Sequence, residues 1–229
     1  MVNNVGKRIY ADFDRPDRKL VELFRGIPVA NISDCMNRLF VMRSRIHPMG
    51  KGKNIIGTAF TVKVAPGDNL LFNKALSLAK AGDVIVVDDC GNTDRSLCGD
   101  IMYRTAEVRG FAGFVVDGAV RDVEYLEESD FPVFACAATS KGPYKNGPGE
   151  INTVISCGGQ VVRPGDIIVG DVNGVLVIKP EEAEIIYESV KGKLAEEEEL
   201  SEAIKDPEWV DDFIENIVKE KNFPIFDKA

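Results

Sequence analysis

Three short apolar runs, with helix-type patterns between them, constrain the fold more than any other feature of the chain. The runs lie in "AGDVIVVDD", "GFVVDG" and "FPVFACAA". The first two are apolar at consecutive positions instead of alternating, which is typical of strands buried on both faces. A helical pattern at residues 99–109 separates these two runs. Strands that alternate with helices predict βαβ units around a parallel sheet.

The rest of the chain adds hairpins and helices to this core. Residues 17–39 predict two short helices, with "NISD" as the N-cap of the second, and the segment from Gly57 predicts a strand, a Pro-Gly turn and a helix through Leu78. Residues 141–152 are rich in Gly, Pro and Lys and predict a loop. The run "DIIVGDVNGVLVIK" predicts a hairpin that turns at Asn173-Gly174. We therefore expect an α/β core in residues 1–180 and a helical extension in residues 181–229 that packs on the core or on a neighbouring subunit. Its helices are expected from Pro180 to about Lys205 and at 208–220.

Composition excludes several classes of protein. No apolar run of 18 residues exists to span a bilayer, and the N-terminus lacks the apolar region of a secretory signal, so we expect a cytoplasmic protein without a membrane partner. The net charge of -9 argues against nucleic-acid binding as the main function. The 5 cysteines form no CxxC pair, which fits reduced thiols.

The chain has 1 histidine, His47, beside a proline. Histidine-rich metal sites are therefore excluded within one chain, and a Ser-His-Asp triad is disfavoured because no G-x-S-x-G elbow is present. We expect His47 to be structural or exposed. Any acid-base chemistry must then use carboxylates, other titratable side chains or a metal.

Charged residues cluster where the buried runs end. Asp88, Asp89 and Asp117 follow apolar residues, and each run has a second charged cluster downstream, Gly99-Asp100 and Arg121-Asp122. Carboxyl ends of strands in open α/β sheets are where ligands usually bind, so both clusters are predicted to meet on one rim.

Two interpretations of these clusters remain open. In one, Arg121 forms a surface ion pair with a neighbouring aspartate, an interaction worth under ~1 kcal/mol. In the other, the backbone amides of Gly99, Asp100, Ile101 and Met102 open a helix and bind an anionic ligand.

The motifs also carry a resemblance. "GD", twenty residues and "RD", with "PGDNLLFNKAL", "DGAVRD" and "CGGQVVRPGDIIVGDVNGVLVI", resemble the family of 4-hydroxy-4-methyl-2-oxoglutarate/4-carboxy-4-hydroxy-2-oxoadipate aldolases, which is related to the regulator of ribonuclease activity A. The likeness covers roughly residues 20 to 185. It implies an α/β/β/α sandwich with mixed sheets, assembled as a homotrimer or hexamer with active sites between subunits.

The resemblance also implies roles for particular residues. Asp122 would be the protein ligand of a divalent metal, Mg²⁺ or Mn²⁺, and a site without His or Cys suits such a hard ion. Arg121 would contact the keto oxygen of a 2-oxo acid substrate, and the amides of residues 99–102 would receive its carboxylate. Asp100 would hold a water for proton transfer. The implied reaction is cleavage of a 4-hydroxy-2-oxo acid to pyruvate and a second oxo compound, with oxaloacetate decarboxylation as a side activity.

Other functions compete with this one. A regulator-like protein that binds and inhibits another enzyme would share the core, although the shorter regulators largely lack the extension after Pro180. A methyltransferase is disfavoured because no G-x-G-x-x-G loop follows the first core strand. A lyase acting on an unrelated oxo acid, such as a sugar acid, stays open. Glu197 lies in an apolar helical stripe and either reaches a neighbouring subunit's site or belongs to a solvated face.

Overall fold

The structure of the chain, a computed structural model, describes residues 4–224 and 226 and divides into two compact units, residues 1–187 and 188–229. Each unit is described by itself. The strands are β1 His47–Pro48, β2 Ile55–Val64, β3 Asp83–Ser96, β4 Gly113–Val120, β5 Val133–Ala138, β6 Gly149–Ile151, β7 Ile155–Cys157, β8 Gln160–Val162, β9 Ile167–Asp171 and β10 Gly174–Ile178. The helices are α1 Arg18–Glu22, α2 Val29–Cys35, α3 Leu70–Ala75, α4 Asp100–Val108, α5 Val123–Glu128, the 3₁₀ helix η1 Pro180–Glu182, α6 Ala183–Ala203 and α7 Pro207–Glu220.

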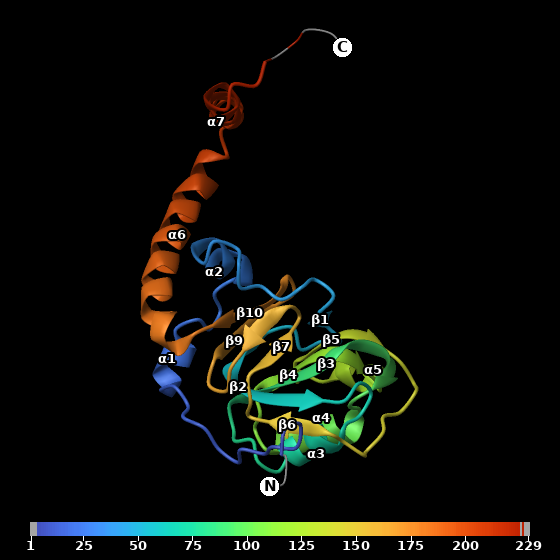
Figure 1. Cartoon of the computed structure of the whole chain (residues 1–229). Coiled ribbons are helices and arrows are strands. Elements are labelled where there is room, and N and C mark those ends of the chain that lie inside the picture. The colour runs from blue at the N-terminus through green and yellow to red at the C-terminus, as the bar shows by residue number, and fades with distance from the viewer. Residues whose placement is uncertain (1–3, 225, 227–229) are drawn as a thin grey trace. The chain divides into compact units, whose positions relative to one another are not determined.

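A mixed sheet of 8 strands forms the centre of the first unit (Figure 1). Its order is β1-β5-β4-β3-β2-β9-β10, with β6 paired to β2 beside that path. The strands β2, β3, β4 and β5 are parallel to one another, and β9 and β10 form the predicted antiparallel hairpin. The three apolar runs are therefore adjacent strands of one sheet, as the sequence predicts.

Both faces of the parallel strands are covered, and the alternation along β3 shows how. Ile85 and Val87 pack with side chains of α3 and α4, including Phe72 and Tyr103. Val84 and Val86 face the other way and pack with β7–β10. Because α2 in turn contacts β9 and β10, the layers run α, β, β, α. The predicted α/β class and its layering are confirmed.

Three local predictions are wrong. The "NISD" residues lie inside α2, which begins at Val29 after Pro28. The amide of Val29 donates to the Asp171 carboxylate at 3.0 Å, so a residue far along the chain caps this helix. The strand β3 continues past Asp88 and Asp89 to Ser96, and β4 continues past Asp117 to Val120. Register shifts between β3 and β4 allow this continuation. The loop at 141–152 also contains β6, which pairs with β2.

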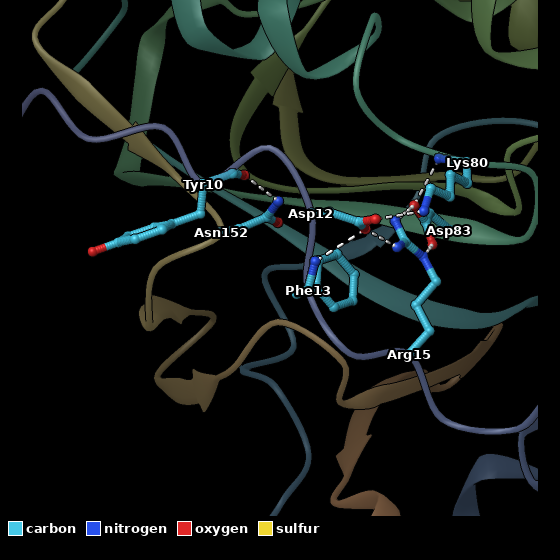
Figure 2. Close-up of polar contacts among 7 residues, drawn as sticks. All are labelled: Tyr10, Asp12, Phe13, Arg15, Lys80, Asp83 and Asn152. Carbon is cyan, nitrogen blue, oxygen red and sulfur yellow. Dashed lines mark hydrogen bonds and ion pairs between the residues drawn. The ribbon is translucent and has the colours of Figure 1, made fainter.

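Residues 4–17, here called the N-terminal strap, contain neither helix nor named strand, yet they are tied to the core (Figure 2). The Tyr10 amide donates to the carbonyl of Ile151 at 3.2 Å. The Arg15 guanidinium donates to both oxygens of Asp83 at 2.8 and 2.7 Å, and the Asp83 side chain is 1% exposed. The sequence pattern predicts no structure for this segment, because its order depends on contacts with residues some 70 to 140 positions away.

The second unit contains most of α6 and all of α7. A bilayer-spanning helix would need a longer apolar stretch than any helix within residues 4–224 provides. Glu197 lies in α6 and is half-buried, and both of its proposed roles stay predictions.

Candidate functional site

Five of the six predicted site residues line one cavity, of about 350 Å³, beside the start of α4. Gly99, Asp100, Ile101, Met102 and Arg121 all line it. Arg121 also lines an adjoining hollow of about 380 Å³, and Asp122 belongs to that hollow. Two segments that are twenty residues apart in the sequence are therefore brought together, as expected from adjacent parallel strands.

Asp122 has a special backbone conformation. It precedes α5 with φ 56° and ψ 44°, the left-handed region that aspartate and asparagine enter most readily among residues with a side chain. Its Oδ2 accepts the Asp100 amide at 3.1 Å and lies 3.4 Å from Arg121 Nε. The Asp122 side chain is 40% exposed, so the carboxylate is fixed by these contacts and still open to a ligand.

Gly99 is the N-cap of α4 and allows this close approach. A Cβ at this position would lie 2.2 Å from Asp122 Oδ2 and 3.0 Å from the Arg121 side chain. Its backbone is extended, with φ −155°. The absence of a side chain is therefore required for space and not for backbone freedom.

The Arg121 backbone is fixed from both sides. Its amide donates to the carbonyl of Cys98 at 3.0 Å, and its carbonyl accepts the hydroxyl of buried Tyr103 at 2.8 Å. Burial raises the pKa of the Tyr103 hydroxyl well above its ordinary value, so this hydroxyl stays protonated and keeps donating. The Arg121 side chain is 45% exposed and lines the cavity.

The amides at the start of α4 are partly committed already. The Asp100 amide donates to Asp122, and the Met102 amide donates to the carbonyl of Gly99 at 2.9 Å. Among the described residues, the amides of Gly99 and Ile101 donate no hydrogen bond within the protein. These two amides are therefore favoured as donors to a ligand. The Asp100 side chain is 42% exposed and lies 3.7 Å from Arg104 Nε.

The cavity has a further wall that sequence analysis missed. It includes Asn69 and Asn73 from the region of α3 and Lys145 from the loop before β6. Asn69 is 4% exposed, and its Nδ2 donates to the carbonyl of Leu97 at 2.7 Å. Its Oδ1 has no hydrogen-bond partner among the described residues. The available signals were "PGDN" and the lysines of "KGPYKNGPG", but their meeting depends on tertiary contacts.

The three strand aspartates are not cavity residues. Asp117 is buried in β4, where it accepts two nitrogens of Arg45 and the Gly158 amide. Asp88 pairs with Lys63 at 3.0 Å. Asp89 is fully buried and accepts the Gly67 amide at 2.8 Å, and burial raises its pKa to about 7. Because their strands continue beyond them, these carboxylates lie inside the sheet, where they bind basic side chains and backbone amides instead of lining the cavity.

His47 lies at the edge of the sheet in β1. It is exposed, and its Nδ1 is 3.0 Å from the Arg45 carbonyl. The prediction that His47 is structural or exposed is confirmed, and all 5 cysteines are free thiols.

The donor chemistry of the site fits a hard divalent cation. Within the described residues, no three His, Cys, Asp or Glu side chains come together as a metal-binding group. Mg²⁺ keeps several waters and is often held by one or two carboxylates. The carboxylate of Asp122 is half-exposed and lines the hollow of about 380 Å³, which leaves space for a hydrated ion. This position suits that mode of binding.

Comparison with known proteins now assigns the family. The RraA-like family model, described as Aldolase/RraA, matches residues 29–177. The chain is 44% identical over 183 residues to the "Putative 4-hydroxy-4-methyl-2-oxoglutarate aldolase" of Halalkalibacterium halodurans, covering 80% of this chain and 87% of that one. The chain therefore belongs to the RraA-like family, and the predicted resemblance is confirmed.

Two solved structures show the same fold under different functional names. The RNA-processing inhibitor RraA from Thermus thermophilis superposes with TM-score 0.61 and 32% identity, covering 66% of this chain and 92% of that one. A structure described as S-adenosylmethionine:2-dimethylmenaquinone methyltransferase, from Geobacillus kaustophilus, gives TM-score 0.63 and 28% identity, covering 67% and 95%. Since one fold carries several functional names, the function must be argued from the site.

Proposed function

We propose that this protein is a divalent-metal-dependent aldolase that cleaves a 4-hydroxy-2-oxo acid into pyruvate and a second oxo compound. The observation that carries the proposal is the contact of Asp122 with both the Asp100 amide, at 3.1 Å, and the Arg121 side chain, at 3.4 Å, where the cavity and the adjoining hollow share Arg121. Relatives named as aldolases support the same class of reaction.

Each residue has a role that its geometry supports. Asp122 would hold Mg²⁺ or Mn²⁺, which when bound supplies Lewis-acid stabilisation of negative charge on the oxygens of the oxo acid. The exposed guanidinium of Arg121 would contact the keto oxygen. The amides at residues 99–102, chiefly those of Gly99 and Ile101, would receive the carboxylate at the N-terminus of α4, where the helix dipole favours an anion.

The bond changes assign a task to Asp100. Its carboxylate would accept, through a water, the proton of the C4 hydroxyl. The C3–C4 bond then breaks, C4 becomes the carbonyl carbon of the second product, and the electron pair of that bond stays with C3, which makes the pyruvate half an enolate. Arg121 stabilises the charge that develops on the enolate oxygen, a type of contact worth several kcal/mol, on the order of 10²–10³ in rate. Asp100 would then return the proton, through the same water, to C3, which completes pyruvate. Oxaloacetate decarboxylation would develop the same enolate, so we propose it as a side activity.

An assay for pyruvate tests this function. Purified protein is incubated with 4-hydroxy-4-methyl-2-oxoglutarate or oxaloacetate, with Mg²⁺ or Mn²⁺ and then with EDTA, and pyruvate is followed with lactate dehydrogenase and NADH. We expect release that chelation abolishes and added metal restores. Activity that survives exhaustive chelation would refute the role of the metal.

The second candidate is a regulator that binds and inhibits another enzyme. The likeness to the RNA-processing inhibitor from Thermus thermophilis favours it. Lack of turnover of any hydroxy-oxo acid by metal-loaded protein would shift the choice to this candidate. We also propose a homotrimer or hexamer, which light scattering coupled to size-exclusion chromatography would measure.

A further inference from the structure

One wall of the cavity is formed by a segment without regular structure. Residues 142–147 precede β6, and Gly142, Pro143 and Lys145 of this segment line the cavity. A segment of this kind has no helix or sheet ladder to fix it. Its shape therefore depends on individual contacts with its surroundings.

The contacts come from residues 67–70, immediately before and at the start of α3. The Tyr144 amide donates to the carbonyl of Gly67 at 2.8 Å, and the Asn69 amide donates to the carbonyl of Tyr144 at 2.9 Å. These bonds form an isolated bridge between two parts of the chain that are more than seventy residues apart. They place Asn69 and Lys145 on the same cavity.

Asp68 stands at the centre of this bridge. Its Oδ2 accepts the amides of Asn146 at 2.5 Å and Gly147 at 3.0 Å, and its Oδ1 accepts the amide of Leu70 at 2.9 Å. The residue is 4% exposed. A buried carboxylate is expensive unless its oxygens are hydrogen-bonded, and here one carboxylate joins the loop to the first residue of α3.

Two residues of β3, Asp89 and Arg95, hold this bridge against the sheet. The Gly67 amide donates to buried Asp89 of β3 at 2.8 Å. Arg95 donates to the carbonyl of Gly142 at 2.8 Å and stacks on the Tyr144 ring, with its guanidinium carbon 3.9 Å from the ring centre. These contacts fix Gly67 next to Asp68, so the Asp68 carboxylate holds the loop from a fixed position.

We propose that Asp68 is a positioning residue, which holds residues 142–147 so that Gly142, Pro143 and Lys145 form one wall of the cavity. The inference rests on the proposed function for its kinetic consequence. Asp68 is not among the residues that line the cavity, so it acts through the loop and not on the substrate directly. Its loss therefore weakens substrate binding through Lys145 and the adjoining wall, and it raises KM more than it lowers kcat.

The test compares Asp68→Asn with a matched variant, Asp83→Asn. Asparagine at 68 keeps one acceptor oxygen but cannot accept all three amides. Asp83 is another buried carboxylate, bound by Arg15 and by the Lys80 amide at 2.8 Å. It is the first residue of β3, whereas the cavity is lined by Ser96 at the other end of that strand. Both variants lower the thermal unfolding temperature, and only Asp68→Asn should affect the cavity.

Two measurements separate positioning from general destabilisation. Hydrogen exchange at residues 144–147 should become roughly 10–100-fold faster in Asp68→Asn, the factor expected for a lost hydrogen bond to a charged group, and stay unchanged in Asp83→Asn. The KM for the oxo acid should rise about tenfold in Asp68→Asn alone, with kcat nearly preserved. Should Asp68→Asn fail to fold, Arg95→Gln, which releases the other brace, should show the same two changes in smaller degree.

Wild-type exchange and KM in Asp68→Asn would overturn the inference, as would equal KM changes in Asp68→Asn and Asp83→Asn. Failure of the proposed function is visible separately, because the wild-type protein would then release no pyruvate while the exchange measurement still reports whether Asp68 holds the loop.

Discussion

The backbone amide of Asp100 donates a hydrogen bond to the side chain of Asp122 at 3.1 Å. This bond joins the first turn of α4 to the left-handed residue that precedes α5. It turns one oxygen of the Asp122 carboxylate toward the protein and leaves the group 40% exposed. The same contact orients a candidate metal ligand and sets its distance from the proposed anion-binding amides.

Replacing Asp122 by asparagine should abolish metal-dependent turnover without unfolding the protein. Asparagine tolerates the left-handed backbone at φ 56° and keeps an acceptor for the Asp100 amide, so only the charge is lost. The apparent affinity for Mg²⁺ or Mn²⁺ should fall by more than the roughly 10–100-fold that loss of an outer-shell partner costs. Metal titrations of pyruvate release measure this, and Asp122→Ala adds backbone strain that Asp122→Asn avoids. Unchanged metal dependence in Asp122→Asn would contradict the assignment.

Removing the Arg121 side chain should lower kcat by about 10²–10³, the loss typical of a missing donor to a developing negative charge. Because this side chain is 45% exposed, stability should change little. Millimolar guanidinium should restore part of the activity of Arg121→Ala, a response that a purely structural role would not give. Arg109→Ala is the control, since Arg109 lies exposed at the C-terminal end of α4, away from the cavity. Full activity in Arg121→Ala would refute the role.

The sequence predicts the buried strands of the core and the meeting of Asp100 with Arg121, and there is a physical reason for both. Consecutive apolar residues report burial on both faces, and the carboxyl ends of adjacent parallel strands must meet, so the pattern alone places Asp100 and Arg121 together. The predicted position of Asp117 is wrong, because a polar residue inside a strand looks like a strand end until its partner is known. That partner, Arg45, lies 72 residues away.

The missed features share this dependence on distant partners. Nothing local in "PGDN" shows that Asp68 binds the amides of Asn146 and Gly147, and nothing local in the first seventeen residues shows that Arg15 meets Asp83. Both contacts bridge more than sixty residues. Periodicity reports burial, whereas such contacts require the folded chain.

Stability should fall as pH rises through the titration of Asp89. Burial raises the pKa of this carboxyl from 3.8 to about 7, so between these values the folded state binds more protons than the unfolded state. The free energy of unfolding therefore decreases with rising pH in that window, by roughly 4 kcal/mol at most, from 1.36 kcal/mol per unit of pKa. Urea unfolding between pH 4.5 and 8 measures the slope for the wild type and for Asp89→Asn. The free energy of unfolding of the wild type, minus that of Asp89→Asn, should decrease through this window and level off above pH 7. Equal slopes for the two proteins would show that Asp89 does not titrate there.

Gly99→Ala tests whether the arrangement of the site, and not only its residue types, carries function. The added Cβ would lie 2.2 Å from Asp122 Oδ2 and 3.0 Å from the Arg121 side chain, so both side chains must move. The backbone at Gly99 is extended and accepts alanine without strain. We expect a large loss of kcat/KM, about 10²-fold, the cost of misplacing reacting groups by roughly 1 Å, with a cooperative unfolding transition retained. Gly192→Ala in α6 is the matched control, because no atom lies within 4 Å of its added Cβ, and it should keep activity and stabilise the helix by about 0.5–1 kcal/mol. Wild-type turnover in Gly99→Ala would mean that the contact between α4 and Asp122 is dispensable, and the proposed site would then have to be placed elsewhere on the chain.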